Sequence, residues 1–231
     1  KNIGEPIIDW QGDKFNSDLR SAAHPNSRFT VSAVNNPSYS ELAEAPEGVP
    51  ISAIVFGGRR KKLAPLVYEA NNWKHGVLVG AGVASETTAA AIGEVGIVRR
   101  DPMAMKPFCG YNFADYWSHW LSFSEKSDKL PKIFHVNWFR QNEDGKFLWP
   151  GFGENLRVLR WIIDRCESRV SARSTSIGNI PNTKDIDTND LDISKDVLEE
   201  LLTVENKEWL QEVNSIGEYF YQAKLKDPTN G

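Results

Sequence analysis

Two arginines lie in segments that suit the binding of an anion. Arg28 ends the run PNSR, in which the proline disfavours helix and favours a loop or a strand start. Arg59 follows an apolar, β-rich run over 51–56 and two glycines, which would let a ligand approach the backbone closely. A guanidinium binds a phosphate or a carboxylate through paired hydrogen bonds. From spacing alone, each arginine could equally pair with a surface carboxylate, and the four cations over 59–62 could be the solvated end of a hairpin.

The stretch 131–164 combines aromatic side chains with a turn and a glycine-flanked loop. Alternation over 133–138 predicts a strand, and an Asp-Gly turn at 144–145 predicts a return into a second short strand over 146–149. A Pro-Gly-Phe-Gly loop then leads into a helix with apolar residues at helical spacing: Leu156, Leu159, Ile162, Ile163 and Cys166. Two strands and this loop could form a slot for a flat ring. The simpler interpretation, favoured by spacing alone, is a hairpin whose aromatic side chains are core.

A third segment, 80–93, is small, nearly free of charge and bounded by glycines. This composition is typical of a mobile loop or lid. A short alanine-rich helix capped by Ser85 explains the same pattern equally well. Among the histidines, His75 is more simply a structural residue than a ligand, and His119 is expected to be solvated on the outer face of a helix.

Composition limits the classes of function. The chain has 231 residues, enough for one large domain or two small ones, and a net charge of -4, which does not indicate a nucleic-acid or anionic-membrane partner. No apolar run approaches the roughly 20 residues that span a bilayer. The sequence starts with Lys1 and shows no signal or transit peptide, so we expect a fragment or a processed form. Cys109 and Cys166 lack metal-like spacing and indicate a reduced, intracellular protein.

The remaining pattern predicts an α/β fold with mixed sheets and flanking helices. Strands are expected over 51–56, 66–70, 76–80 and 95–98, and helices from 113, over 197–202 and over 209–220. Residues 169–194 look like an irregular polar arm. We expect one domain over 1–231, in which 169–231 form this arm and a terminal helical layer. The phosphate-loop pattern G-x-x-x-x-G-K-[ST] is absent.

Taken together, the motifs resemble a known family. The segments HPNSRF, EGVPISAIVFGGRR, PLVYEANNWKHGVLVGAG, SETTAAA, DPMAMKPFCGYNF, LPKIFHVNWFR and FLWPGFGENLRVLRWI occur in this order across about 22–165. This order resembles the C-terminal half of GTP-dependent phosphoenolpyruvate carboxykinase. The resemblance implies the C-terminal nucleotide-binding portion of that fold. It also implies conversion of oxaloacetate and GTP to phosphoenolpyruvate, GDP and CO2, a step of gluconeogenesis.

The resemblance also implies roles for particular residues. Asn26, Ser27 and Arg28 match the segment that binds the organic acid. Arg28 also reaches the transferred phosphate as a catalytic residue, and Arg59 matches the arginine that binds the nucleotide phosphates. The lid that closes over the site, with Ser85 and Glu86 as catalytic residues, corresponds to Ser85, Glu86, Thr87, Thr88, Ala89, Ala90 and Ala91. The guanine pocket corresponds to Trp138, Phe139, Phe147 and Phe152, and the base edge is read by Asn155 with the backbone of Phe152, Gly153 and Glu154.

Cofactors, partners and location follow from the same resemblance. The family uses Mn2+ together with Mg2+ bound to GTP, and its metal ligands precede the matched region. We therefore expect no metal site here, since His24, His75, His119 and His135 do not match the metal histidine. The resemblance implies GTP or GDP and oxaloacetate or phosphoenolpyruvate as partners, without nucleic acid or membrane. It further implies a full-length monomer in the cytoplasm, with the mitochondrial matrix as the alternative.

Several positions depart from the family pattern, including Val31-Ser32 and Asn35-Asn36-Pro37 in place of the usual Thr-Pro and Gln-Cys-Pro. The family has an arginine before Ser-Glu and a glutamate after the alanine run, where this chain has Ala84 and Ile92, and a proline where it has Lys61. Loss of the lid arginine and glutamate should weaken lid closure. Because the phosphate loop and the metal ligands of the family precede the matched region, we expect an isolated chain that holds half of an active site and is inactive alone. The alternative is a degenerate paralogue or fragment that binds a guanine nucleotide or a partner without turnover.

Overall fold

The structure is a computed structural model that describes residues 7–9, 11–15, 22–24, 30–87 and 96–225, with the backbone alone at 223–225. Contacts divide the chain into two compact units, one of 1–50 with 88–94 and one of 51–87 with 95–231. The described part of the first unit holds two short 3-10 helices, η1 (Ala33–Asn35) and η2 (Glu41–Glu44), and an isolated bridge between Ile8 and Lys14. All further elements belong to the second unit.

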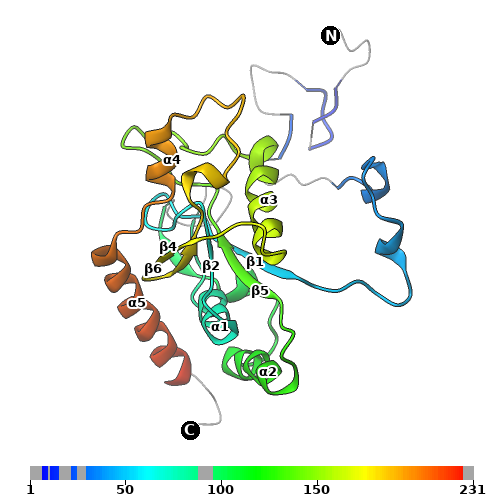
Figure 1. Ribbon diagram of the computed structural model, residues 1–231. Coiled ribbons are helices and arrows are strands. Elements are labelled where there is room, and N and C mark those ends of the chain that lie inside the picture. Colours follow the sequence, from blue (N-terminus) through cyan, green and yellow to red (C-terminus); the bar gives the residue numbers. More distant parts are fainter. Residues whose placement is uncertain (1–6, 10, 16–21, 25–29, 88–95, 226–231) are drawn as a thin grey trace. The chain divides into compact units, whose positions relative to one another are not determined.

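A five-stranded mixed sheet forms the centre of the second unit (Figure 1). Its strands are β1 (Ala53–Gly57), β2 (Val67–Glu69), β5 (Lys132–Val136), β6 (Arg173–Thr175) and β7 (Gly178–Ile180), in the order β1-β5-β2-β7-β6. Strands β1 and β5 are parallel, and the other pairs are antiparallel. A separate antiparallel pair joins β3 (Ala84–Glu86) to β4 (Val98–Arg100).

Helices cover both faces of the central sheet. They are α1 (Trp73–Ala81), α2 (Phe113–Lys126), α3 (Asn155–Cys166), α4 (Lys195–Leu201) and α5 (Asn206–Leu225), with 3-10 turns η3 (Pro102–Ala104), η4 (Phe152–Glu154) and η5 (Thr183–Asp185). Successive side chains of β5 point to opposite faces. Phe134 therefore packs in a core with Trp161 of α3 and Leu201 of α4, whereas Ile133 packs in a second core with Val77 of α1. The mixed α/β class with flanking helices is confirmed.

The strand predicted over 76–80 is wrong, because these residues lie within α1. Asn72 caps this helix by accepting a hydrogen bond from the backbone N–H of His75 at 2.9 Å. A Cβ at Gly76 would lie 2.4 Å from the side chain of Ile133, and a Cβ at Gly80 would lie 2.6 Å from the ring of Phe56. The two glycines, four residues apart, thus let a helix lie directly on β1 and β5. Glycine has a low helix propensity, so the same two residues made the segment look less helical in the sequence.

Other segments differ from the prediction in smaller ways. Residues 146–149 form no strand but an isolated bridge between Gln141 and Phe147, after the predicted turn at Gly145. The arm over 169–194 contains β6 and β7, which join the central sheet. Helix α3 is confirmed, although its fully buried side chains are Val158, Trp161 and Ile162. Among the described helices, none is both long and apolar enough to cross a membrane.

Candidate functional site

A buried asparagine fixes the loop that follows β1. Asn137, at the end of β5, is fully buried and uses both ends of its amide. Its Oδ1 accepts hydrogen bonds from the backbone N–H groups of Arg60 and Phe139, both at 3.2 Å. Its Nδ2 donates to the carbonyls of Arg60 at 2.9 Å and Ala64 at 3.0 Å. The loop that carries Arg59 is therefore held against the central sheet on both sides of Arg60.

Arg59 links this loop to the β3 strand and to an aromatic ring. Its backbone N–H donates to Ser85 Oγ at 3.1 Å, and its carbonyl accepts from the N–H of Glu86 at 2.8 Å. Its guanidinium lies over the ring of Phe139, 4.5 Å from the centroid. The electrostatic attraction between the guanidinium and the ring face holds the side chain beside the ring. A positive group is thus presented beside an aromatic surface.

The aromatic residues of the predicted pocket occupy different environments. Phe139 and Phe147 meet edge to face, with centroids 6.1 Å apart. Phe147 is 58% exposed and Phe152 is 95% exposed, which is unusual for phenylalanine and leaves apolar surface for a ligand. Trp138 is half-buried and packs against the core that contains Phe134. The structure thus brings Arg59, Phe139 and Phe147 together. That Trp138 and Phe152 contribute to the same pocket stays a prediction.

Asn155 is oriented by a buried tryptophan. Its Oδ1 accepts a hydrogen bond from Trp149 Nε1 at 2.9 Å, and Trp149 is 1% exposed. An indole N–H can only donate, so it requires the amide oxygen of Asn155 to face it. The amide NH2 group then points elsewhere and can donate to an acceptor such as a base carbonyl. Glu154, by contrast, pairs its carboxylate with Arg157 at 2.6 Å, and its backbone N–H donates to the carbonyl of Gly151 at 2.9 Å.

The base of the predicted lid is tied to the loop of Arg59. Ser85 and Glu86 lie in β3, and the Glu86 carboxylate accepts a hydrogen bond from the backbone N–H of Lys61 at 2.7 Å. Lys61 Nζ lies 3.8 Å from the same carboxylate. A proline at 61, the residue typical of the resembled family, would have no N–H to donate. Thr87 pairs with Ile97 and Gly96 where the β3-β4 hairpin enters its connecting segment.

Several predicted residues lie outside the described part of the chain: Asn26, Ser27, Arg28, Thr88, Ala89, Ala90, Ala91 and Ile92. Their roles stay predictions. Among the described residues, no group of three or more His, Cys, Asp or Glu side chains could hold a metal ion. These residues therefore do not fit a metal site by themselves. Both cysteines are free thiols.

Two histidines are neutral structural groups. Burial, and to a smaller degree the positive charge of Arg60, lowers the pKa of His135 to about 4. His135 is buried, stacks on Tyr68 with centroids 5.1 Å apart, and its Nδ1 contacts no partner among the described residues. Burial also lowers the pKa of His75, whose Nδ1 accepts a hydrogen bond from the N–H of Asn71 at 3.0 Å. Neither arrangement favours proton transfer at neutral pH.

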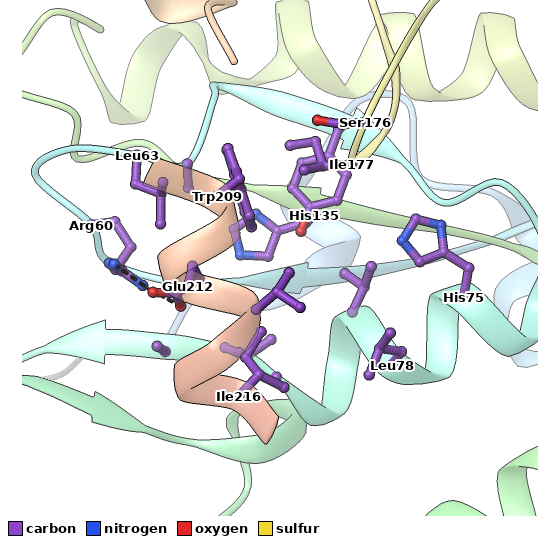
Figure 2. A pocket seen from close by; sticks show the side chains of 17 residues that line it. Arg60, Leu63, His75, Leu78, His135, Ser176, Ile177, Trp209, Glu212 and Ile216 are labelled. Carbon is purple, nitrogen blue, oxygen red and sulfur yellow. Dashed lines mark hydrogen bonds and ion pairs between the residues drawn. The ribbon is translucent and has the colours of Figure 1, made fainter. Parts of the chain in front are cut away.

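Sequence reasoning did not identify four residues that support this region: Arg60, Arg100, Asn137 and Glu212. Glu212 of α5 accepts hydrogen bonds from both arginines, and Figure 2 shows its pair with Arg60. Burial alone would raise the pKa of Glu212, but its bonds with Arg60 and Arg100 outweigh burial and lower it. The partners are more than 100 positions apart, so no local pattern could connect them. Asn137, a polar residue at the end of an alternating strand, was the one available signal.

Comparisons with known proteins agree on one family. A family model described as the phosphoenolpyruvate carboxykinase C-terminal P-loop domain matches residues 1–230. The chain is similar to phosphoenolpyruvate carboxykinase [GTP] of Anaeromyxobacter dehalogenans strain 2CP-1, with 52% identity over 215 residues, 93% of this chain and 36% of that protein. It is also similar to the proteins of the same name from Chlamydia muridarum, at 52% over 214 residues (92% and 36%), and Thermoplasma volcanium, at 50% over 218 residues (94% and 37%). The chain thus spans about a third of the length of these curated relatives.

Proposed function

This chain belongs to the GTP-dependent phosphoenolpyruvate carboxykinase family, and we propose that it forms the part of such an enzyme that binds GTP. The complete enzyme would convert oxaloacetate and GTP to phosphoenolpyruvate, GDP and CO2, a step of gluconeogenesis. The observation that carries the proposal is the position of Arg59. Its guanidinium lies over Phe139, and its backbone is bonded to the base of the lid. One residue thus adjoins an aromatic surface, a phosphate-binding loop and the lid strand.

The base of the nucleotide would bind at the exposed aromatic surface. Phe147 and Phe152 supply apolar ring faces on which a purine can stack, and stacking itself does not distinguish guanine from adenine. Asn155 supplies the distinction in this proposal. Its NH2 group, directed away from Trp149, can donate to the O6 carbonyl of guanine but not to the amino group at the same position of adenine. Backbone groups of Phe152 and Gly153 and the carbonyl of Glu154 complete the recognition, since the N–H of Glu154 already donates to Gly151.

The phosphates would bind at the loop of Arg59. Phosphoryl transfer needs positive groups around the transferring phosphate, and a guanidinium binds phosphate oxygens in pairs. Decarboxylation of oxaloacetate leaves an enolate that must attack the phosphate rather than take a proton from water. A lid over 85–91 would exclude water during this step. Glu86 would serve mainly to hold the lid base to Lys61, because its carboxylate is already bonded there.

The remaining assignments rest on the resemblance. Asn26, Ser27 and Arg28 would bind the organic acid, with Arg28 also reaching the transferred phosphate. Mn2+ and the Mg2+ of GTP would be held by residues outside this chain. The metals would neutralise phosphate charge, and this chain would contribute orientation of the nucleotide and exclusion of water.

A coupled assay of the complete protein tests this proposal. With Mn2+ and saturating oxaloacetate, GTP should support formation of phosphoenolpyruvate, and Arg59→Ala should abolish most of the rate. Arg99→Ala is the matched control. It removes the same charge from a β4 position opposite Ser85, close to the same lid base. Equal rates in the Arg59 variant and the unchanged protein would contradict the phosphate-binding role.

A second function is a nucleotide-binding protein without turnover. The observation that favours it is Ala84, which is buried at 4% exposure and stands where the family has a lid arginine. A protein of this kind would bind GDP with the same selectivity but form no phosphoenolpyruvate under any metal condition. The coupled assay and a GDP titration, performed on the same preparation, separate the two functions.

A further inference from the structure

One carboxylate of α5 bonds to two arginines from distant segments. Oε1 of Glu212 accepts hydrogen bonds from Arg60 Nη1 at 2.9 Å and Arg100 Nη1 at 2.6 Å, and its Oε2 accepts one from Arg60 Nη2 at 3.3 Å. The three side chains are 12%, 13% and 10% exposed, in the order Glu212, Arg60 and Arg100. With so little water nearby, the two guanidiniums would repel each other strongly without the carboxylate between them.

Each arginine belongs to a segment next to the proposed phosphate site. Arg60 follows Arg59 directly, and its own backbone is bonded to Asn137. Arg100 lies in β4 opposite Ala84 of β3, the strand to which the backbone of Arg59 is bonded. Arg59 is therefore connected to the carboxylate by two routes, one along its own loop and one through the base of the lid.

Arg100 has two further partners that fix it in place. Its Nη1 also donates to the carbonyl of Gly82 at 3.0 Å, and its Nη2 donates to Ser215 Oγ at 2.8 Å. Ser215 lies one turn after Glu212 on the same helix. The guanidinium thus joins the end of α1, the β4 strand and α5.

Apolar packing between α5 and the sheet is incomplete at this point. A cavity of about 230 Å³ lies beside Glu212, lined by residues that include Leu78, His135, Trp209 and Ile216 (Figure 2). A helix over a cavity of this size gains less from dispersion and burial than one in full contact. The position of α5 next to the loop therefore depends strongly on its polar contacts with the two arginines.

We propose that Glu212 is a positioning residue for phosphate binding, which keeps Arg60 and Arg100 together and so fixes Arg59 relative to the lid base. The inference rests on the proposed function, in which Arg59 binds the nucleotide phosphates. Among the described residues, no hydrogen bond joins Glu212 directly to Phe147 or Phe152, and its link to Phe147 runs only through Arg59 and the ring of Phe139. Its loss should therefore weaken the binding of the phosphates and leave the binding of the base unchanged.

The test compares GDP with guanosine, which carries the same base without phosphates. In calorimetric titrations of the complete protein, Glu212→Gln should weaken GDP binding about tenfold, or about 1.4 kcal/mol, and leave guanosine binding unchanged. Glu218→Gln removes the same charge from an exposed position of the same helix and should change neither affinity. Glu212→Asp keeps the charge but shortens the side chain, so its loss of GDP affinity should be smaller.

Two results would overturn the inference. Unchanged GDP affinity in a folded Glu212→Gln protein would show that the contacts do not position Arg59. Equal losses for GDP and guanosine would show a general loss of structure. If Glu212→Gln does not fold, as judged by circular dichroism, the Glu212→Asp variant decides by the same comparison. If the protein without any substitution bound neither GDP nor guanosine, the proposed function itself would be contradicted. Failure of the inference and failure of the proposed function are therefore distinguishable.

Discussion

At the scale of single residues, the site depends on side chains whose partners fix their direction. The cation–π contact directs Arg59, the indole of Trp149 directs Asn155, and Asn137 holds the loop by three hydrogen bonds. Preorganised groups of this kind bind a ligand without a large loss of side-chain freedom on binding. Motif resemblance predicted Arg59 and Asn155, but not the residues that orient them. Those partners are hydrogen-bonding groups brought close by the fold, and no spacing rule reveals them.

The exposed phenylalanines give the first prediction. Phe147→Ala or Phe152→Ala should weaken GDP binding by roughly 1–3 kcal/mol, by analogy with aromatic–base stacking measured on nucleic acids. Phe108→Ala is the matched control, because Phe108 is 81% exposed and lies outside the proposed pocket. The measurement is a GDP titration of the complete protein. Unchanged affinity in both pocket variants would count against the aromatic slot.

Trp149 gives a prediction about selectivity. Trp149→Phe keeps an aromatic ring but removes the N–H that orients Asn155, so the ratio of GDP to ADP affinity should fall about tenfold. Trp161→Phe is the control, since Trp161 is equally buried and its N–H has no partner among the described residues. Competition titrations with both nucleotides measure the ratio. A ratio that falls equally in both variants would indicate lost packing and contradict the proposed role of the N–H.

At the scale of elements, long periodic segments were predictable and short ones were not. Helices α2, α3, α4 and α5 and strand β5 follow from their apolar periodicity. Strands β6 and β7 have three residues each, too few to show alternation, and their pairing with the sheet is a tertiary effect. The α1 segment was mistaken for a strand, because its glycines and its short apolar run VLV imitate one. Those glycines are required by packing rather than by local preference.

The glycines of α1 give a prediction about stability. Gly80→Ala should destabilise the protein by about 1–3 kcal/mol, because the new methyl would overlap the ring of Phe56 on β1. Gly217→Ala adds the same methyl to helix α5, where nothing lies within 4 Å, and should stabilise by up to about 1 kcal/mol. Denaturant unfolding of the two variants measures both effects. A Gly80→Ala protein as stable as Gly217→Ala would contradict the close approach of α1 to the sheet.

At the scale of the whole molecule, one buried histidine should affect the pH dependence of stability. His135 has an ordinary pKa of 6.5 when unfolded and about 4 when folded, so the unfolded chain binds more protons between these values. Its contribution is fully present above pH 6.5 and is lost as the pH falls towards 4, by up to about 1.4 kcal/mol per pH unit. His135→Gln should remove this component, and the exposed His119→Gln should retain it. Urea unfolding from pH 7 to 4 gives the comparison.

The family of the chain could be predicted from its motifs. The share of a relative's length that the chain spans could not. Seven segments in a fixed order predicted the family, the α/β class and the location of the nucleotide site. The chain spans 36% of the length of its relatives from Anaeromyxobacter dehalogenans and Chlamydia muridarum. Activity and metal binding therefore belong to the proposed complete enzyme, whereas the proposed recognition of guanine uses residues of this chain.

The most direct test is the affinity of the complete protein for GDP and for ADP, measured side by side by calorimetric titration. The proposed pocket of Arg59, Phe147 and Asn155 predicts that GDP binds at least about tenfold more tightly than ADP, since guanine offers a carbonyl acceptor to the amide of Asn155 where adenine has an amino group. Equal affinities for the two nucleotides, or no binding of GDP, would contradict the assignment of the guanine pocket to this chain.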